Sequence, residues 1–200
     1  MTAAMAERFQ MSDDGPWDLI LETWRELDVP EGWHAEIDGD QITLAPPPHR
    51  HHNHITEGVQ RALYGGGLPK DLGLYQTLGV QITPLQRLYV PDLVIVPREL
   101  TSGASDTKDP VDAGEALLVV EVTSKGNANV DRVRKLRAYA QALVPVYLLI
   151  DRFDPDGPAS TVLTEPEGGI YTSVQRVPFG EIVQLPEPFD IKIDTTDFPT

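Results

Sequence analysis

The chain has 200 residues and a formal net charge of −15, because 31 aspartate and glutamate residues outnumber 16 lysine and arginine residues. This acidity excludes a general nucleic-acid coat protein, which needs a positively charged surface to neutralise phosphates. The chain contains no cysteine, which excludes disulfides and thiolate metal sites, so any metal ion must be held by oxygen or imidazole ligands.

The length favours a single domain over residues 1–200, with residues 1–15 as a flexible N-terminal tail. No apolar run approaches the roughly 18 residues of a membrane helix. The N-terminus also lacks the basic-then-apolar order of a signal peptide. We therefore expect a cytoplasmic protein that does not contact membranes, and the lack of cysteine agrees with this.

The first quarter of the chain predicts a helix, a hairpin and a loop. The helix is expected from about Pro16 to Asp28, with Asp13 or Asp14 as its N-cap. A β-hairpin follows and turns at Asp38-Gly39. The three prolines at 46–48 exclude regular structure directly after it.

The middle of the chain predicts one helix, two strands and an exposed loop. Apolar residues recur at helical spacing over 52–64, and a run of three glycines ends this helix. Strands are expected at 74–82 and 88–96. Residues 101–114 are polar and rich in turn-forming residues, which predicts a loop.

The following segment predicts a β-α-β unit, with a strand at 116–123, a helix at about 129–143 and a strand at 146–150. Both strands are nearly continuous apolar runs, which is typical of a sheet covered on both faces. Residues 160–185 predict an edge hairpin of short strands. Together these elements predict an α/β (α+β) fold, with a mixed central sheet flanked by helices and an added N-terminal helix and β-hairpin.

One acidic residue, Glu121, interrupts the apolar run LLVVEVTSK at 117–125. Burying an ionised carboxylate costs on the order of several kcal/mol, so a basic partner, a catalytic role or a metal ion must compensate. A second acid, Asp92, follows Pro91 and begins the apolar run LVIV. If the two strands are neighbours, the carboxylates converge, and a hard cation such as Mg²⁺ would relieve their repulsion. The alternative is that each acid pairs separately with an arginine.

The helix after Glu121 contains Asp131 and Lys135, whose spacing of four residues is typical of an exposed ion pair. Because this helix follows a strand that carries a carboxylate, Lys135 could instead reach that carboxylate. A lysine beside metal-bound acids suits phosphodiester hydrolysis, since it can orient a water molecule and offset negative charge in the transition state. Thr123 lies on the same strand face as Glu121.

The string HRHHNHITE at 49–57 contains four histidines, which suggests a metal site. Their spacing matches no zinc-binding helix motif, and the histidines cannot all face one way. We therefore expect one of these histidines to take part in the functional site and the others to be solvent-facing loop residues.

These motifs together resemble a known family. A PD pair that opens a strand is followed about thirty residues later by LLVVEV.S, and then by D...K..AYA and VPVYLLID. This order is similar to that of the Uma-two family of restriction-endonuclease-like proteins, within the PD-(D/E)xK nuclease-like superfamily. The resemblance spans roughly residues 30–155. It implies a restriction-endonuclease-like fold with acidic residues that bind Mg²⁺.

The resemblance also implies roles for individual residues. Asp92 matches the PD aspartate and Glu121 the second acid, both as catalytic residues that bind the metal. Glu36 resembles an upstream acid that completes the site. His52 matches the histidine of the family's P-P-x-x-x-H loop, so the resemblance implies that His52 lines the functional pocket.

The catalytic lysine is displaced in this chain. The superfamily places it two residues after the second acid, where this sequence has Thr123. The resemblance implies that Lys135, on the following helix, supplies it instead. Lys125 is an alternative that strand geometry does not exclude.

Positive charge is concentrated around Glu121. Residues 121–152 contain three acidic and six basic residues, whereas the chain as a whole is strongly acidic. Charges farther apart than a Debye length of roughly 8–10 Å are screened, so DNA binding must depend on a few cations close to the site. We expect Arg134 or Arg137 to contact phosphates that flank the cleaved one.

The leading hypothesis is a Mg²⁺-dependent endonuclease that hydrolyses phosphodiester bonds in DNA, with Mn²⁺ as an alternative metal. A second hypothesis is a non-catalytic nuclease-like domain that binds a protein or nucleic-acid partner. A third is a hydrolase of a small phosphorylated substrate. The resemblance further implies a homodimer, since cleaving both strands of DNA requires two sites related by a two-fold axis.

Overall fold

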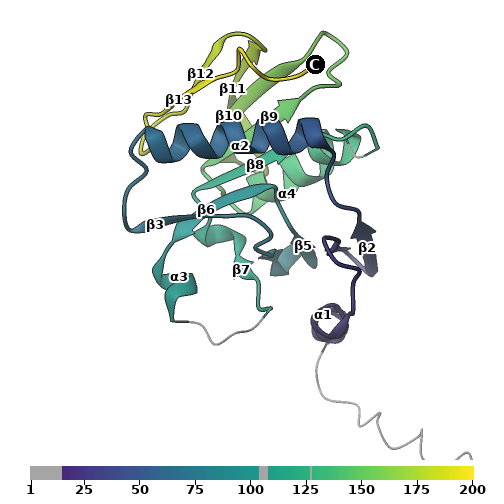
Figure 1. Ribbon diagram of the computed structural model, residues 1–200. Helices are drawn as coiled ribbons and strands as arrows, with labels where there is room; N and C mark the ends of the chain where they lie inside the picture. The colour runs from purple at the N-terminus through teal and green to yellow at the C-terminus, as the bar shows by residue number, and fades with distance from the viewer. Residues whose placement is uncertain (1–14, 104–107, 127) are drawn as a thin grey trace, which may run out of the picture.

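The structure is a computed structural model that describes residues 15–103, 108–126 and 128–200 (Figure 1). Its largest sheet has six strands in the order β11-β10-β9-β8-β6-β3. β8 and β9 are parallel and the other neighbours are antiparallel, so the sheet is mixed, as predicted. The strands are β3 (Leu72–Tyr75), β6 (Leu93–Pro97), β8 (Leu118–Val122), β9 (Val146–Asp151), β10 (Ala159–Glu167) and β11 (Ile170–Pro178).

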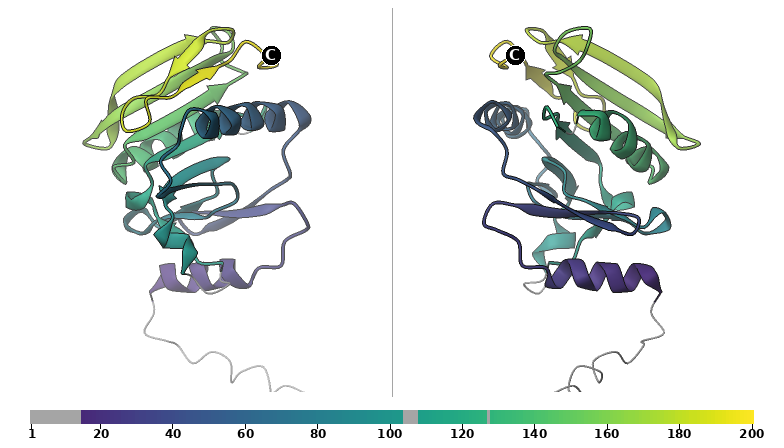
Figure 2. Two further views of the ribbon diagram at one scale, coloured as in Figure 1. Left: turned by 60° about the vertical axis from the view of Figure 1, so that its left-hand side comes forward. Right: turned by 90° about the vertical axis from the view of Figure 1, so that its right-hand side faces the viewer.

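Helices cover both faces of this sheet, α2 (Arg50–Gly65) on one side and α4 (Leu136–Gln141) on the other (Figure 2). Strand residues alternate between the faces. Val120 of β8 therefore packs in the core cluster that contains α2, whereas Val119 packs in the cluster that contains α4. This burial on both faces explains the continuous apolar sequence of β8, and it directs Glu121 to the side of α4.

A second sheet has five strands in the order β2-β1-β5-β4-β7. α1 (Pro16–Glu26) packs against it, and Trp17 and Leu21 of the helix join Ile37 and Leu88 of the sheet in a small apolar core. The strands of this sheet are β1 (His34–Asp38), β2 (Gln41–Ala45), β4 (Val80–Ile82), β5 (Arg87–Tyr89) and β7 (Val111–Asp112).

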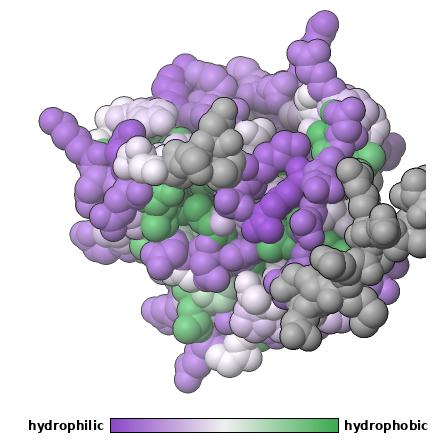
Figure 3. Space-filling model, turned by 90° about the horizontal axis from the view of Figure 1, so that it is seen from below, coloured by the Kyte–Doolittle hydropathy of each residue, from purple (hydrophilic) through white to green (hydrophobic). Residues whose placement is uncertain are grey.

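On the side of the molecule seen from below, the surface is mostly hydrophilic and its hydrophobic groups are separate (Figure 3).

A short C-terminal hairpin of β12 (Ile182–Gln184) and β13 (Lys192–Asp194) packs beside α2. Val183 and Ile193 of this hairpin belong to the same core cluster as α2. The last residues of the chain then lie above the N-terminal end of α2 (Figure 1). This brings the C-terminus close to the start of the histidine-rich segment.

The strands predicted at 74–82 and 88–96 are wrong in extent, because each is divided between the two sheets. The first gives β3 and β4, and the second gives β5 and β6. The chain turns between β3 and β4 at Thr77, which has a φ of 57°. Pro91 has no N–H to donate and interrupts the second run. As a result, Asp92 lies in the link immediately before β6.

Three smaller expectations also differ from the structure. Gly15 is the N-cap of α1, so the predicted N-cap at Asp13 or Asp14 is wrong. Both aspartates, and most of the predicted tail, lie outside the described residues. The predicted loop at 101–114 contains the end of α3 (Glu99–Ser102), β7 and the start of the 3₁₀ turn η2 (Ala113–Glu115). The helix predicted at 129–143 contains a π-helical segment, η3 (Val130–Lys135), before α4.

The remaining predicted elements are confirmed: α1, the β1–β2 hairpin, α2, β8, β9 and the β10–β11 edge hairpin. A further 3₁₀ turn, η1 (Thr83–Leu85), joins β4 to β5. Within the described part of the chain, no helix combines the length and apolarity needed to cross a membrane.

Candidate active site

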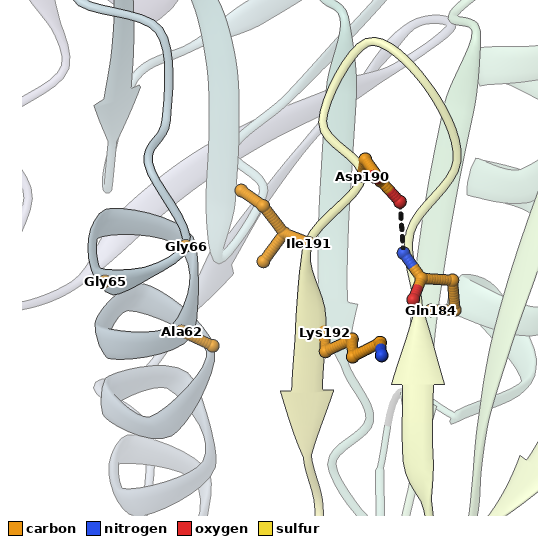
Figure 4. A pocket seen from close by; sticks show the side chains of 7 residues that line it. All are labelled: Ala62, Gly65, Gly66, Gln184, Asp190, Ile191 and Lys192. Atoms are coloured by element: carbon orange, nitrogen blue, oxygen red, sulfur yellow. Dashed lines mark hydrogen bonds between the residues drawn. The ribbon is translucent and has the colours of Figure 1, made fainter.

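A cavity of about 350 Å³ lies where β6 and β8 meet the start of α2 and the π-helical segment. Its charged and histidine side chains are His34, Glu36, His49, His52, Asp92, Glu121, Lys125, Asp131, Lys135 and Arg152. A larger cavity of about 660 Å³ lies between the C-terminal end of α2 and the β12–β13 hairpin (Figure 4). Its two charged residues are Asp190 and Lys192, and Asp190 already accepts a hydrogen bond of 3.0 Å from Gln184. The smaller cavity is therefore the candidate site.

Glu121 is buried in β8, at only 3% exposure, and its charge is compensated by neighbours that come from the helix side. Its Oε1 accepts hydrogen bonds from Lys135 Nζ at 3.0 Å and from the Tyr139 hydroxyl at 3.3 Å. Burial raises the pKa of Glu121 well above its usual range, while Lys135 opposes that shift and other carboxylates add to it. The basic partner of this buried acid is thus a lysine, and not the arginine of the alternative interpretation.

Lys135 lies at the centre of a group of carboxylates. Its Nζ is 2.9 Å from Glu36 Oε1, 3.0 Å from Glu121 Oε1 and 3.7 Å from Asp131 Oδ1. It also lies 5.4 Å from the centroid of the Tyr89 ring, within cation–π range. Burial alone would lower the pKa of Lys135, but the three carboxylates outweigh it and hold that pKa well above the usual range. Lys135 is therefore a buried ammonium group that stays charged at neutral pH.

Glu36 comes from β1 in the other sheet, so the site spans both sheets. Besides the contact with Lys135, its Oε1 accepts a hydrogen bond of 2.9 Å from the backbone N–H of Val90. This second bond anchors the carboxylate to the link between β5 and β6. The structure therefore brings the predicted upstream acid into direct contact with the predicted lysine.

Asp92 reaches the cavity because β6 and β8 are antiparallel neighbours, with Leu93 opposite Val120. Its Oδ2 accepts a hydrogen bond of 2.7 Å from the backbone N–H of Val122, which follows Glu121. Its Oδ1 lies 3.0 Å from His52 Nε2. The Val122 N–H and the His52 ring thus orient the two oxygens of Asp92, and the side chain of Asp92 remains 21% exposed.

His52 lies in the first turn of α2, and its ring is held between two partners. Nε2 faces Asp92, and Nδ1 lies 3.4 Å from the Thr56 hydroxyl, one helical turn further on. That hydroxyl donates to the His52 carbonyl at 3.0 Å. Because a carboxylate can only accept, Nε2 must carry a proton to bond Asp92. The histidine predicted for the pocket therefore lies beside the PD aspartate.

Asp131 belongs to the site, although its spacing from Lys135 is equally typical of an exposed ion pair. The residue is 4% exposed, and the π-helical segment places both side chains toward Glu121. Burial raises the pKa of Asp131 to about 7, while Lys135 opposes the shift. No local sequence pattern indicates a π-helical turn here, so Asp131 is a site residue that the sequence does not predict.

A second network anchors the strand end beside the cavity. Asp151, at the end of β9, accepts a hydrogen bond of 2.9 Å from the Thr123 hydroxyl and a two-point contact from the Arg132 guanidinium. Burial works to raise the pKa of Asp151, but the bonds from Arg132, Thr123 and the Phe153 N–H lower it. Thr123, at the superfamily's lysine position, thus ties β8 to β9. Neither Asp151 nor Arg132 was predicted.

The other basic residues predicted for the site lie farther out. Lys125 is exposed and lines the mouth of the cavity. Arg134 is 64% exposed in its side chain and pairs with Asp38 at 3.2 Å. Arg137 is exposed on α4. Neither arginine is part of the cavity lining.

The donor chemistry of the cavity suits a hard divalent cation. Glu36, Asp92, Glu121 and Asp131 present oxygen ligands, and their negative charge exceeds what Lys135 supplies. Among the described residues, no three acidic or histidine side chains are grouped so that they could hold an ion by themselves. Mg²⁺ at phosphate sites is typically held by one or two carboxylates, with water and substrate as further ligands. Asp92 and Glu121 fit that pattern.

An aspartate before one strand, a glutamate in the neighbouring strand of the same mixed sheet and a buried lysine from the adjoining π-helical segment are the features of a restriction-endonuclease-like fold. The family model described as "Uma2: Putative restriction endonuclease" matches residues 21–196, so the chain belongs to this family. The chain is also similar in fold to a crystal structure of a "putative nuclease belonging to DUF820" from Anabaena variabilis ATCC 29413. The two share 14% identity and a TM-score of 0.65, over 87% of this chain and 90% of that chain. No curated protein matches the chain.

Proposed function

We propose that the protein is a Mg²⁺-dependent endonuclease that hydrolyses phosphodiester bonds in DNA, with Mn²⁺ as a substitute metal. The observation on which this rests is the contact of buried Lys135 with Glu121 and Glu36, in the same cavity as Asp92. Membership of a family described as restriction endonucleases supports the reaction class. In this proposal Asp92 and Glu121 hold the metal, and Lys135 and Glu36 complete the catalytic group.

A bound Mg²⁺ would supply a Lewis acid for water and for the phosphoryl oxygens. Lys135 offers N–H donors and a fixed positive charge, which would orient the attacking water and stabilise the negative charge that develops on the phosphoryl group. Glu36 holds the ammonium group from the opposite side, at 2.9 Å. His52 and the Val122 N–H orient the two oxygens of Asp92. Hydrogen-bonded partners of this kind preserve the orientation of a metal ligand.

The proposal is tested by cleavage of supercoiled plasmid with Asp92→Ala. Wild type should convert the plasmid in Mg²⁺ or Mn²⁺, and Asp92→Ala should lose this activity because one of two metal ligands is gone. Asp40→Ala is a matched control, since Asp40 is an exposed aspartate in the β1–β2 turn. If wild type and Asp92→Ala act alike on DNA, the endonuclease proposal fails and the non-catalytic binding domain becomes the better account. Activity on small phosphate esters alone would favour the third hypothesis.

We also propose that the protein forms a homodimer. β11 is at the end of the strand order of the six-stranded sheet, and Ile170 and Val174 on this strand are 56% and 60% exposed. Such an edge can supply apolar contact to a second copy. Sedimentation at micromolar concentration should therefore give a species of about twice the 22.1 kDa chain mass. A single species at the chain mass contradicts this proposal.

A further inference from the structure

Arg152 lines the mouth of the cavity, directly after the end of β9, and three groups hold its guanidinium in place. Nε donates a hydrogen bond of 3.0 Å to the Pro199 carbonyl. Nη2 lies 2.9 Å from His51 Nδ1, and because a guanidinium only donates, that nitrogen must accept. The guanidinium carbon is also 5.3 Å from the centroid of the Phe153 ring, a cation–π contact.

None of these three partners is a carboxylate. Arg132 pairs with Asp151, and Arg87 and Arg134 both pair with Asp38. Among the residues that the structure describes, no carboxylate lies within ion-pair distance of Arg152. In a chain with a net charge of −15, an arginine held in place without an acid at the entrance of an acidic cavity needs an explanation.

The Pro199 and His51 contacts occupy only part of the donor set of the guanidinium. Among the hydrogen bonds of the described residues, none uses Nη1, so its two N–H groups can serve a ligand. A planar guanidinium matches the geometry of a phosphate, and holding it in advance lowers the entropy lost on binding. The N-terminus of α2, which begins at this cavity, adds positive potential, and no acidic residue stands in its first turn.

We infer that Arg152 binds a backbone phosphate of the DNA strand next to the phosphate that reacts beside Lys135. The inference rests on the proposed function in one respect, that the ligand of the cavity is DNA. It replaces the expectation from sequence that Arg134 or Arg137 would bind the flanking phosphate, since neither arginine is part of the cavity lining. Phe153 acts as the support on which the guanidinium rests.

The inference is tested by the salt dependence of DNA binding, measured by fluorescence anisotropy with a labelled mixed-sequence duplex and excess EDTA, so that no cleavage occurs. A protein that neutralises one phosphate fewer shows a log affinity against log salt slope that is smaller by about 0.9. Arg152→Ala should show this change together with about a tenfold loss of affinity at low salt, as for the loss of a charged hydrogen bond. Arg152→Lys keeps the charge and should retain the wild-type slope.

Arg98→Ala is the matched control. Arg98 is exposed, its Nε donates 2.9 Å to the Lys70 carbonyl, and it lies outside the cavity lining. Its removal should leave the slope unchanged. Because Arg152 also holds Pro199, Arg152→Gln is a second neutral variant that can still donate to that carbonyl. It should show the same smaller slope as Arg152→Ala.

An unchanged slope for both neutral variants overturns the inference, and so does a wild-type protein that binds no DNA. The failure of the proposed function is distinct from these outcomes, since it would appear as absent plasmid cleavage in Mg²⁺. If the wild type cleaves no DNA but Arg152→Ala shows the reduced slope, the phosphate site at Arg152 is supported and the endonuclease proposal fails.

Discussion

Replacing Lys135 with methionine is expected to lower the rate of DNA cleavage by about 10²–10³-fold, the loss typical of removing one group that stabilises transition-state charge. Methionine keeps the length and much of the apolar volume of the lysine side chain but has no charge to offer. DNA binding should change far less, because Lys135 is 6% exposed and lies deep in the cavity rather than at its mouth. Single-turnover cleavage and anisotropy measured on the same variant separate the two effects.

The same substitution should also destabilise the fold. It leaves Glu36, Glu121 and Asp131 without their shared cation, and breaking a buried ion pair on one side typically costs about 3–5 kcal/mol. Lys135 has a raised pKa in the folded state, so its stabilisation is complete below the unfolded pKa of about 10.4 and is lost only as the pH rises through the higher folded value. At neutral pH, wild type therefore has the full contribution.

The loss should depend on pH in a defined direction. The pKa of Glu121 is raised by burial in the folded state, so this carboxylate costs stability increasingly as the pH rises above its unfolded pKa of about 4.3. Without Lys135 that cost grows, and urea unfolding should show a larger difference between variant and wild type at about pH 8 than at about pH 5. Lys70→Met, which removes an exposed lysine, is the control for charge.

Lys125→Met decides between the two candidate lysines. Lys125 lines the mouth of the cavity but is exposed, whereas Lys135 contacts both glutamates. If Lys135→Met cleaved DNA normally and Lys125→Met did not, Lys125 would be the catalytic lysine. If both variants cleaved normally, neither lysine would take part in the chemistry.

The central residues of the site could be found from sequence because each violates a local pattern. Glu121 is a carboxylate within a buried apolar run, and such a residue is costly unless it is compensated. Asp92 stands between Pro91 and another apolar run. An interruption of this kind is visible in one dimension, and the antiparallel pairing of β6 with β8 then brings the two acids into one cavity.

The partners of these residues could not be found in the same way. Asp131 has the spacing of an ordinary surface ion pair, and only a π-helical turn buries it beside Lys135. Asp151 ends an apolar strand, which is unremarkable, and its bonds come from Thr123 and Arg132 on other elements. Tertiary contacts of this kind depend on how separate segments pack, and no local pattern encodes them.

The predicted bounds of two strands were wrong for a related reason. Residues 74–82 and 88–96 are apolar enough to form long strands, and their periodicity does not show that each run serves two sheets. Val80, Ile82 and Tyr89 of β4 and β5 pack in the same core cluster as Val94 and Val96 of β6, so the two sheets share this core. The resulting link at Pro91 is what exposes Asp92 to the cavity.

Millimolar Mg²⁺ or Mn²⁺ is expected to raise the melting temperature of the wild-type protein. A ligand at ten times its dissociation constant stabilises the folded state by about 1.4 kcal/mol, which corresponds to about 3–6 °C for a chain of this size. The physical cause is the excess of carboxylates in the cavity, where Asp92 and Glu121 would share the cation. Differential scanning fluorimetry with EDTA as the reference measures this shift.

Glu121→Gln should abolish the metal response while preserving the fold. The glutamine oxygen can still accept the bonds from Lys135 and Tyr139, but the amide is a poor ligand for a divalent cation. Without metal, the variant should be more stable than wild type at about pH 8, because it removes a buried carboxylate whose pKa is raised. That advantage should shrink as the pH falls toward the unfolded pKa of about 4.3, below which the carboxylate is protonated in both the folded and the unfolded state.

The metal response of wild type should in turn grow from about pH 6 to about pH 8, because a cation must displace the proton that burial favours on Glu121. Asp40→Ala should respond to the metal as wild type does, since Asp40 lies in an exposed turn outside the cavity lining. A wild-type melting curve that is unchanged across millimolar Mg²⁺ and Mn²⁺ at both pH values would contradict a metal site at Asp92 and Glu121. A response that survives in Glu121→Gln would place the ion on other carboxylates of the protein.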